Sequence, residues 1–222
     1  MIYLENVVKT YRTRRGDVKA LNDINLRIEK GEFVVVCGPS GSGKTTLLMT
    51  IAAMLHPTSG IVSVEQNSLY AMSVQARAKF RAENIGFVFQ MFHLVPYLNV
   101  VENVLLAGGT VANKNKNAKA LELIEQFGLA GRSYHKPAEL SAGEKQRTAI
   151  ARALFNRPKI ILADEPTGNL DVDNAASVLG YLFQFHKTGG TVILATHGVE
   201  AERFADRTIN LRNGSIANPD KS

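Results

Sequence analysis

The chain has 222 residues, 45% of them hydrophobic and 21% charged, which supports a folded core and excludes a disordered chain. Its single cysteine, Cys37, excludes an internal disulfide framework. No window approaches the ~18 apolar residues of a membrane-spanning helix, and we expect no signal peptide after Met1. The formal charge of +6 suits nucleic acid or an anionic lipid surface, but it is spread along the chain. We expect the one tight basic cluster, Arg12, Arg14 and Arg15, to lie in a solvated hairpin loop.

The amino-terminal part of the chain predicts β structure. Residues 2–8 and 21–28 form two expected strands, and the second alternates apolar with polar side chains. A turn at residues 30–32 leads into the apolar run 33–37. Such a run is typical of a strand buried in a parallel sheet, and we expect Cys37 to pack there as a small hydrophobe.

The next segment matches the phosphate-binding pattern G-x-x-x-x-G-K-[ST]. It comprises Gly38, Pro39, Ser40, Gly41, Ser42, Gly43, Lys44, Thr45 and Thr46. Glycines let successive backbone N–H groups converge on phosphates, Lys44 would reach the terminal phosphates, and Thr45 offers a hydroxyl to Mg²⁺. Residues 47–55, ended by Pro57, predict a helix whose positive end faces the anion. A chance glycine-rich turn is the alternative, but the strand before and the helix after favour a nucleotide triphosphatase.

Beyond this loop, strands and helices alternate as in α/β proteins. The expected elements are strand 61–64, helix 73–83, strand 85–90, strand 159–163, helix 172–187, strand 191–195 and a hairpin at 208–217. The hairpin prediction rests on Asn213-Gly214, a dipeptide that favours a turn with positive φ at both central positions.

The segment 91–157 interrupts the alternation with helical periodicity and almost no strand signal. One helical face carries Ala120, Leu123, Ile124 and Phe127, and Gly128 marks its end. We expect a single domain over residues 1–222. Within it, residues 1–90 and 158–222 would form a β subdomain and an α/β core, and residues 91–157 an inserted helical subdomain.

Two carboxylates follow the apolar strand 159–163. Phosphoryl transfer needs an acid that holds the Mg²⁺ shell and a base that orients the attacking water. Asp164 suits the metal and Glu165 suits the water. Exposed acids at a strand end would be the ordinary explanation if the chain lacked a phosphate loop.

A second candidate phosphate site begins at Ser141. Ser141 and Glu144 have the offset of a capping box, which by itself explains both residues. A helix start with a serine hydroxyl and the N–H of Gly143 also suits a phosphate. Spacing in the sequence does not place this helix beside Lys44.

These motifs, taken in order, resemble the ATP-binding cassette of ABC transporters over essentially the whole chain. The order is the phosphate loop, Gln90, residues 140–144, Asp164-Glu165, residues 169–171 and His197. The segments 89–96 and 167–171 most resemble the lipoprotein-release and macrolide-export branch. The resemblance implies an α/β P-loop NTPase with a RecA-like core, an N-terminal antiparallel β subdomain and an inserted helical subdomain. Ala142 departs from the common Leu-Ser-Gly-Gly signature, but the first helical position accepts a Cβ, so we expect a competent site.

The resemblance also implies a head-to-tail dimer with ATP and Mg²⁺ at each interface. Ser141, Gly143 and the Glu144 that follows them would complete the γ-phosphate site of the other subunit. Asp171 would lie at the dimer seam while capping the next helix.

Other roles within one subunit follow from the same resemblance. Gln90 would contact Mg²⁺ and the water, and His197 would touch the γ-phosphate and hold Glu165. Tyr11 matches the aromatic residue that stacks on adenine.

The implied activity is hydrolysis of ATP that powers a separate integral membrane permease, with this chain peripheral at the cytoplasmic face of the inner membrane. Apolar side chains after Gln90 predict a docking groove, although packing inside the helical subdomain would also explain them: Met91, Phe92, Leu94, Val95, Tyr97, Leu98 and Val100. A soluble ABC-type ATPase acting on nucleic acid or the ribosome is the alternative. We expect no nucleic-acid partner, for two reasons. Chromosome- or repair-type ATPases insert long coiled coils, and this chain has no sustained heptads. Translation-associated cassette proteins normally carry two cassettes in one chain, and this chain has a single set of motifs.

Overall fold

The computed structural model describes residues 1–14, 16–109 and 115–217, which form two sheets and the helices around them. The six-stranded sheet has the order β10 (Ser215–Ala217), β9 (Arg207–Arg212), β3 (Phe33–Cys37), β8 (Thr191–Thr196), β7 (Ile160–Asp164) and β6 (Ile85–Val88). All neighbouring pairs in it are parallel except β10 with β9. The predicted α/β class is confirmed.

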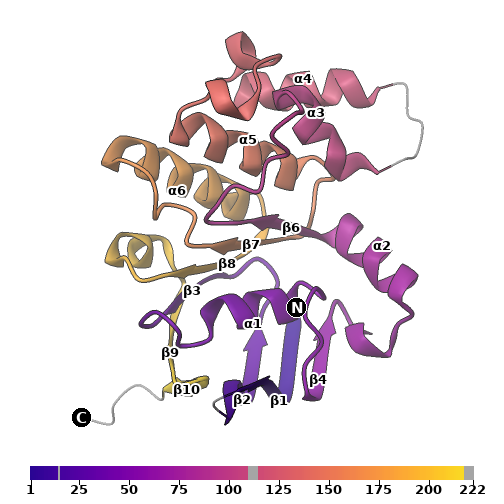
Figure 1. The fold of residues 1–222 in the computed structure, drawn as a ribbon, viewed down its shortest axis with the longest axis vertical. Coiled ribbons are helices and arrows are strands. Elements are labelled where there is room, and N and C mark those ends of the chain that lie inside the picture. The colour runs from indigo at the N-terminus through magenta and orange to yellow at the C-terminus, as the bar shows by residue number, and fades with distance from the viewer. Residues whose placement is uncertain (15, 110–114, 218–222) are drawn as a thin grey trace.

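A second, antiparallel sheet has the order β2 (Gly16–Ile28), β1 (Ile2–Thr13), β4 (Ser59–Val64) and β5 (Asn67–Ser68). Helix α1 (Lys44–Ile51) lies between the two sheets in Figure 1. Its apolar residues share one core with both sheets. The antiparallel subdomain is therefore packed onto the helix that follows the phosphate loop.

Helices cover the other face of the six-stranded sheet. Helices α5 (Ala142–Leu154) and α6 (Val172–Lys187) lie on this face, α3 (Val100–Leu105) and α4 (Lys116–Gln126) pack beyond them against α5, and α2 (Val74–Asn84) precedes β6 at the edge (Figure 1). Strand β3 has a buried core on each of its faces. Val34 and Val36 pack in the core around α1, and Phe33 and Val35 pack in the core on the side of the helices. A strand buried on both faces accounts for its uninterrupted apolar sequence.

Most predicted elements are present within the described residues. Helix α6 has the predicted bounds, and no strand occurs in the described parts of 91–157. Helix α4 buries Ala120 and Ile124, and Gly128 follows it with φ 66°. The Asn213-Gly214 turn has φ values of 49° and 76°, which confirms the hairpin.

Several boundaries were predicted wrongly: strand β2 begins at Gly16 instead of residue 21, and strand β6 ends at Val88 instead of residue 90. Strand β1 continues to Thr13, so Arg12 is paired with Asp17 in the sheet and only Arg14 lies in the turn, while Arg15 falls outside the described residues. The first helix begins at Lys44 instead of residue 47, because Gly43 caps it. It ends at Ile51, well before Pro57. Tyr70 donates its hydroxyl to the carbonyl oxygens of Thr50 (2.7 Å) and Leu55 (2.5 Å), which satisfies backbone groups that a longer helix would have used.

The segment after β6 is fastened to helix α3 by the fully buried Asn103. Its Oδ1 accepts from the N–H of Val95 at 2.7 Å, and its Nδ2 donates to the carbonyl oxygens of Val95, Leu98 and Asn99 at 2.9–3.2 Å. One amide thus satisfies backbone groups of a loop that would otherwise be buried without partners. The sequence did not single out Asn103.

Replacing Asn103 by leucine should lower the free energy of unfolding by at least about 2 kcal/mol, because the variant leaves these buried backbone groups unsatisfied. Urea denaturation measures the change. Asn210→Leu is the control, since Asn210 is exposed on β9 and should stay within about 0.5 kcal/mol of the parent. Equal stability of the Asn103→Leu protein and the parent would contradict the anchoring role.

Candidate nucleotide site

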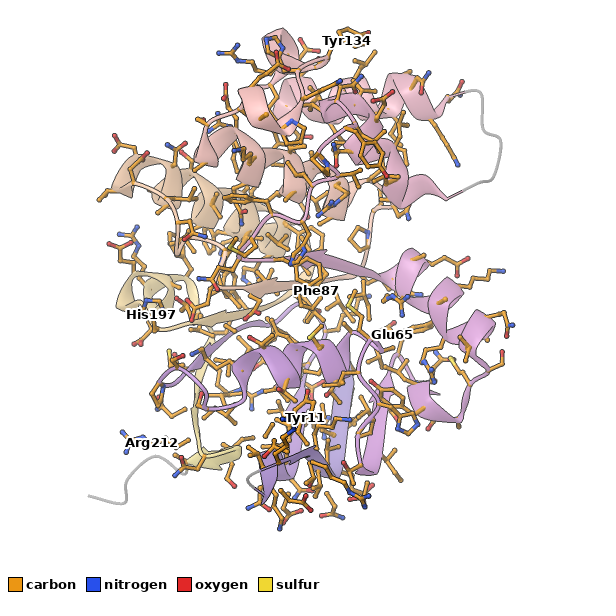
Figure 2. The ribbon with its side chains drawn as sticks, in the orientation of Figure 1. Tyr11, Glu65, Phe87, Tyr134, His197 and Arg212 are labelled. Carbon is orange, nitrogen blue, oxygen red and sulfur yellow. The ribbon has the colours of Figure 1, made fainter. Side chains whose placement is uncertain are left out.

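A cavity of about 530 Å³ opens at the carboxyl ends of the parallel strands. Segments far apart in the chain line it: Ala20, Ser40, Gly41, Gly43, Lys44, Thr45, Thr46, Gln90, Glu165 and His197. All of these except Ala20 were predicted site residues. Figure 2 shows His197 at this end of the sheet and Glu65 at the other end, where a second cavity of about 490 Å³ is lined by no predicted site residue that the structure describes.

The loop between β3 and α1 reaches the cavity through Gly43. This residue has φ 106°, and a Cβ on it would lie 2.2 Å from the carbonyl oxygen of Ala20. Both observations exclude any residue with a side chain. The close approach also explains how Ala20, on strand β2, comes to line the cavity. Spacing along the chain does not reveal such a contact.

Lys44 is the first residue of α1, and its buried side chain turns back to the loop. Its Nζ donates to the carbonyl oxygens of Gly38 at 2.7 Å and Pro39 at 3.2 Å, and it lies 3.5 Å from Oε1 of Glu165. A buried ammonium needs such partners. The positive charge is therefore held between the loop and the end of β7.

Two buried oxygen atoms beside Lys44 have no hydrogen-bond partner among the described residues. They are Oγ of Ser42 and Oδ1 of Asp164. An unsatisfied buried polar group costs about 1–3 kcal/mol, so native proteins keep one where a ligand, ion or water satisfies it. A hydroxyl and a carboxylate oxygen are groups that phosphate and Mg²⁺ can use. The residues present thus fit a nucleotide with its metal ion.

Glu165 directly follows β7 and is held in an unusual backbone conformation, with φ 45°. Its N–H donates to the carbonyl oxygen of Ala195 at 2.8 Å, and its Oε2 lies 2.9 Å from Nδ1 of His197. Left-handed conformations of residues other than glycine are uncommon and cluster at functional sites. The carboxylate is aimed at the cavity between Lys44 and His197.

His197 follows strand β8, and its side chain is 70% exposed. Its Nδ1 lies 2.9 Å from Oε2 of Glu165, so the ring covers the carboxylate from the solvent side. Exposure leaves the rest of the ring free to meet a ligand in the cavity.

Gln90 lies two residues after β6 and lines the cavity. Nδ2 of Asn169 donates to its carbonyl oxygen at 3.2 Å, and a Cβ on Gly168 would lie 3.3 Å from its Nε2. The turn after Glu165 therefore packs directly on Gln90, and a bulkier residue at position 168 would push it.

Burial raises the pKa of Asp164, and the nearby Glu165 raises it further, while a hydrogen bond with Thr45 and the charge of Lys44 oppose the shift. Burial also raises the pKa of the Cys37 thiol, helped by its hydrogen bond to Glu202, to about 11. Cys37 is half-buried beside the phosphate loop, as expected of a small hydrophobe.

The residues predicted to act on a second nucleotide lie elsewhere. Among the described residues, Ser141, Gly143, Glu144 and Asp171 do not line this cavity. Ser141 caps α5 by accepting from the N–H of Glu144 at 3.2 Å, and Glu144 accepts from the N–H of Ser141 at 2.8 Å, which confirms the capping box. Ala142 is the first residue of α5, as predicted.

Asp171 caps α6 and accepts from the N–H of Asn174 at 2.8 Å, as its predicted capping role requires.

The start of α5 is also held by a residue that precedes the helix, since Nε of Arg132 lies 2.9 Å from Oε1 of Glu144. These contacts, with the backbone hydrogen bond from Ser141 as the largest cause, keep the pKa of Glu144 below its usual range.

Tyr11 lies in the β1–β2 hairpin and does not line the cavity either. Its ring is exposed, and Nζ of Lys9 lies 5.3 Å from its centroid. Figure 2 shows it in the antiparallel sheet. An exposed aromatic ring is available for stacking, but this part of the prediction stays a prediction.

Asp164→Asn should raise the Tm of the nucleotide-free protein at pH 7 by about 2 °C or more. The folded state holds the proton of Asp164 more tightly than the unfolded chain, so the cost of ionising it appears as the pH rises above about 4 and grows until the pH passes the folded-state pKa. Calorimetry at pH 4 and pH 7 should show a gain at pH 7 that shrinks at pH 4. Asp17→Asn, at an exposed position, is the control and should change neither value. A lower Tm for Asp164→Asn at pH 7 would contradict the conclusion that burial raises the pKa of Asp164.

Comparisons with known proteins agree with this geometry. A sequence model described as ABC transporter matches residues 21–168. The lipoprotein-releasing system ATP-binding protein LolD 2 of Caulobacter vibrioides is 40% identical, over 97% of this chain and 96% of its own length. The macrolide export ATP-binding/permease protein MacB of Chlorobaculum tepidum is 41% identical over 100% of this chain but only 34% of its own length.

Among solved structures, the cassette MJ0796, a protein of Methanocaldococcus jannaschii, superposes with a TM-score of 0.92. It is 39% identical, the match covers 100% of this chain and 98% of that one, and the structure is a dimer in a post-hydrolysis state with ADP and Pi. The chain therefore belongs to the ABC transporter family as an ATP-binding, ATP-hydrolysing cassette.

Proposed function

We propose that the chain is the ATPase subunit of a membrane transporter of the lipoprotein-release or macrolide-export type, acting as a head-to-tail dimer at the cytoplasmic face of the membrane. The observation that carries the proposal is the position of Glu165, whose two carboxylate oxygens lie 3.5 Å from Lys44 and 2.9 Å from His197 at the mouth of the phosphate-loop cavity. A carboxylate fixed in this way can accept a proton from a water molecule beside a bound phosphate.

Each residue at the cavity has a separate task in this proposal. Lys44 would bind the terminal phosphates, and His197 would keep Glu165 oriented. Bound Mg²⁺ would neutralise part of the phosphate charge, and Thr45, Gln90 and Asp164 are the residues that would hold it. The unsatisfied oxygen of Asp164 supports this assignment.

The cavity of one subunit is only half of the proposed site. The capped start of α5, with Ser141 and Gly143, and the turn at Asp171 lie outside their own subunit's cavity and would reach the partner's. A structural relative that is dimeric with bound ADP and Pi supports this arrangement. ATP would then hold the two copies together.

Glu165→Gln should lower ATP turnover by about 10²–10⁴, because it removes the base but keeps the shape of the side chain. ATP binding should be retained, and ATP should shift the variant from monomer to dimer in light scattering coupled to gel filtration. Glu5→Gln, at an exposed position of β1, should hydrolyse ATP like the parent. A Glu165→Gln protein that turns over ATP normally, or stays monomeric with saturating ATP, would sink the proposed mechanism.

The segment 91–98 supports the proposal of a membrane partner. It carries an exposed apolar side chain near each end, Met91 at 68% and Tyr97 at 74% exposure. Arg152 of α5 donates to the carbonyl oxygens of Phe92 at 2.7 Å and His93 at 2.6 Å. A partner that binds this segment would therefore act on the helix whose first residues are Ala142 and Gly143. No helix among the described residues is long and apolar enough to cross a membrane.

Tyr97→Asp should abolish co-purification of an integral membrane chain while ATP-driven dimerisation of the isolated protein persists. The measurement is affinity capture of the Glu165→Gln form with ATP from detergent extracts, followed by mass spectrometry. Tyr3→Asp is the control, because Tyr3 is an exposed tyrosine of the antiparallel sheet. Capture of ribosomes or nucleic acid by the parent, with steep salt dependence, would favour the alternative of a soluble ATPase instead.

A further inference from the structure

Asn174, in the first turn of α6, connects two parts of the site that the mechanism has so far treated separately. Its backbone N–H and its Nδ2 both donate to the carboxylate of Asp171, at 2.8 Å and 2.7 Å. Its Oδ1 accepts from Nη1 of Arg147 on α5 at 2.9 Å. The amide therefore bridges the turn before α6 and the helix that carries the signature residues.

The chemistry of the two partners fixes the orientation of this amide. A guanidinium can only donate and an ionised carboxylate can only accept, so Oδ1 must face Arg147 and Nδ2 must face Asp171. The hydrogen bonds from Asn174 are the largest causes that keep the pKa of Asp171 below its usual range, so the carboxylate is ionised at neutral pH. An aspartate at position 174 could keep the bond to Arg147 but would repel Asp171.

The same amide also lies against the start of α5. A Cβ on Gly143 would lie 2.1 Å from Oδ1 of Asn174 and 2.5 Å from its Cγ. Gly143 and Arg147 are one helical turn apart, so Asn174 contacts two successive turns of α5 on one face. The glycine is required there because the amide occupies the space that a side chain would need.

We propose that Asn174 is a positioning residue that joins Asp171 to the signature end of α5, so that both are presented to the partner subunit's nucleotide as one rigid unit. The inference rests on the proposed head-to-tail dimer. It assigns to Asn174 no contact with ATP of its own subunit. Loss of the bridge should therefore weaken the ATP-bound dimer while leaving the affinity of the monomer for ATP unchanged.

The test uses the full chain in the Glu165→Gln form, with and without Asn174→Asp. Analytical ultracentrifugation with saturating ATP and Mg²⁺ gives the dimer dissociation constant, and a fluorescent ATP analogue gives the nucleotide affinity of the monomer. We expect Asn174→Asp to raise the dimer dissociation constant at least tenfold and to change nucleotide affinity less than twofold. Ala176→Asp is the matched control, since it adds the same charge at an exposed position two residues on, away from α5, and should change neither value.

A reversed pair gives a readout that a merely structural role would not produce. In the double variant Asp171→Asn with Asn174→Asp, the amide at position 171 can donate to the carboxylate at position 174, which is the parent's hydrogen bond reversed. Asparagine caps a helix as well as aspartate does. The double variant should dimerise more tightly than Asn174→Asp alone. If Asn174→Asp fails to fold, Asn174→Ala, which removes both side-chain bonds without adding charge, replaces it with the same expectation.

Dimerisation of Asn174→Asp with the parent's dissociation constant would overturn the positioning role, and so would equal losses in the Ala176→Asp control. Failure of the Glu165→Gln parent itself to dimerise with ATP would instead overturn the head-to-tail dimer on which the inference rests. The two failures are therefore distinguishable in one experiment.

Discussion

Register in the parallel sheet is the constraint on which the site depends. Strands β3, β8 and β7 lie side by side, with Cys37 opposite Thr196 and Asp164 opposite Ala195. Because side chains from both faces of these strands are buried, a shift by one residue would exchange the two cores and is strongly disfavoured. The phosphate loop, Glu165 and His197 each leave one of these three strands at the same edge. Their meeting is thus fixed by burial far from the cavity.

The site itself works against stability in several places. Glu165 has a left-handed backbone, and buried oxygen atoms of Ser42 and Asp164 have no partner among the described residues. Each feature costs about 1–3 kcal/mol, and a bound anion with its cation would give the two oxygen atoms the partners that they lack. The large shared cores on both sides of the sheet allow the fold to tolerate these local costs. Binding of nucleotide should accordingly stabilise the cassette.

Much of the architecture follows from local sequence, and the remainder depends on contacts across the chain. The loop at Gly43, the carboxylates after β7 and the caps at Ser141 and Asp171 were predictable because spacing and strand context are local signals. Ala20 was missed because only the approach of strand β2 to the loop places it at the cavity.

Asn103 and Asn174 were missed for a related reason. Each is an ordinary asparagine in a helix, and its importance lies in partners that tertiary packing supplies. The end of the first helix was predicted too late because Tyr70, some twenty residues away, satisfies the backbone carbonyls there.

The protonated thiol of Cys37 has a practical consequence for chemical labelling. A thiol whose pKa is about 11 is almost entirely uncharged at neutral pH, and the thiolate is the form that reacts with electrophiles. The native protein should therefore resist maleimides and mild oxidants despite having a sulfur atom next to its phosphate loop. Spectroscopic probes could then be attached to a cysteine engineered on the surface without first removing the natural one.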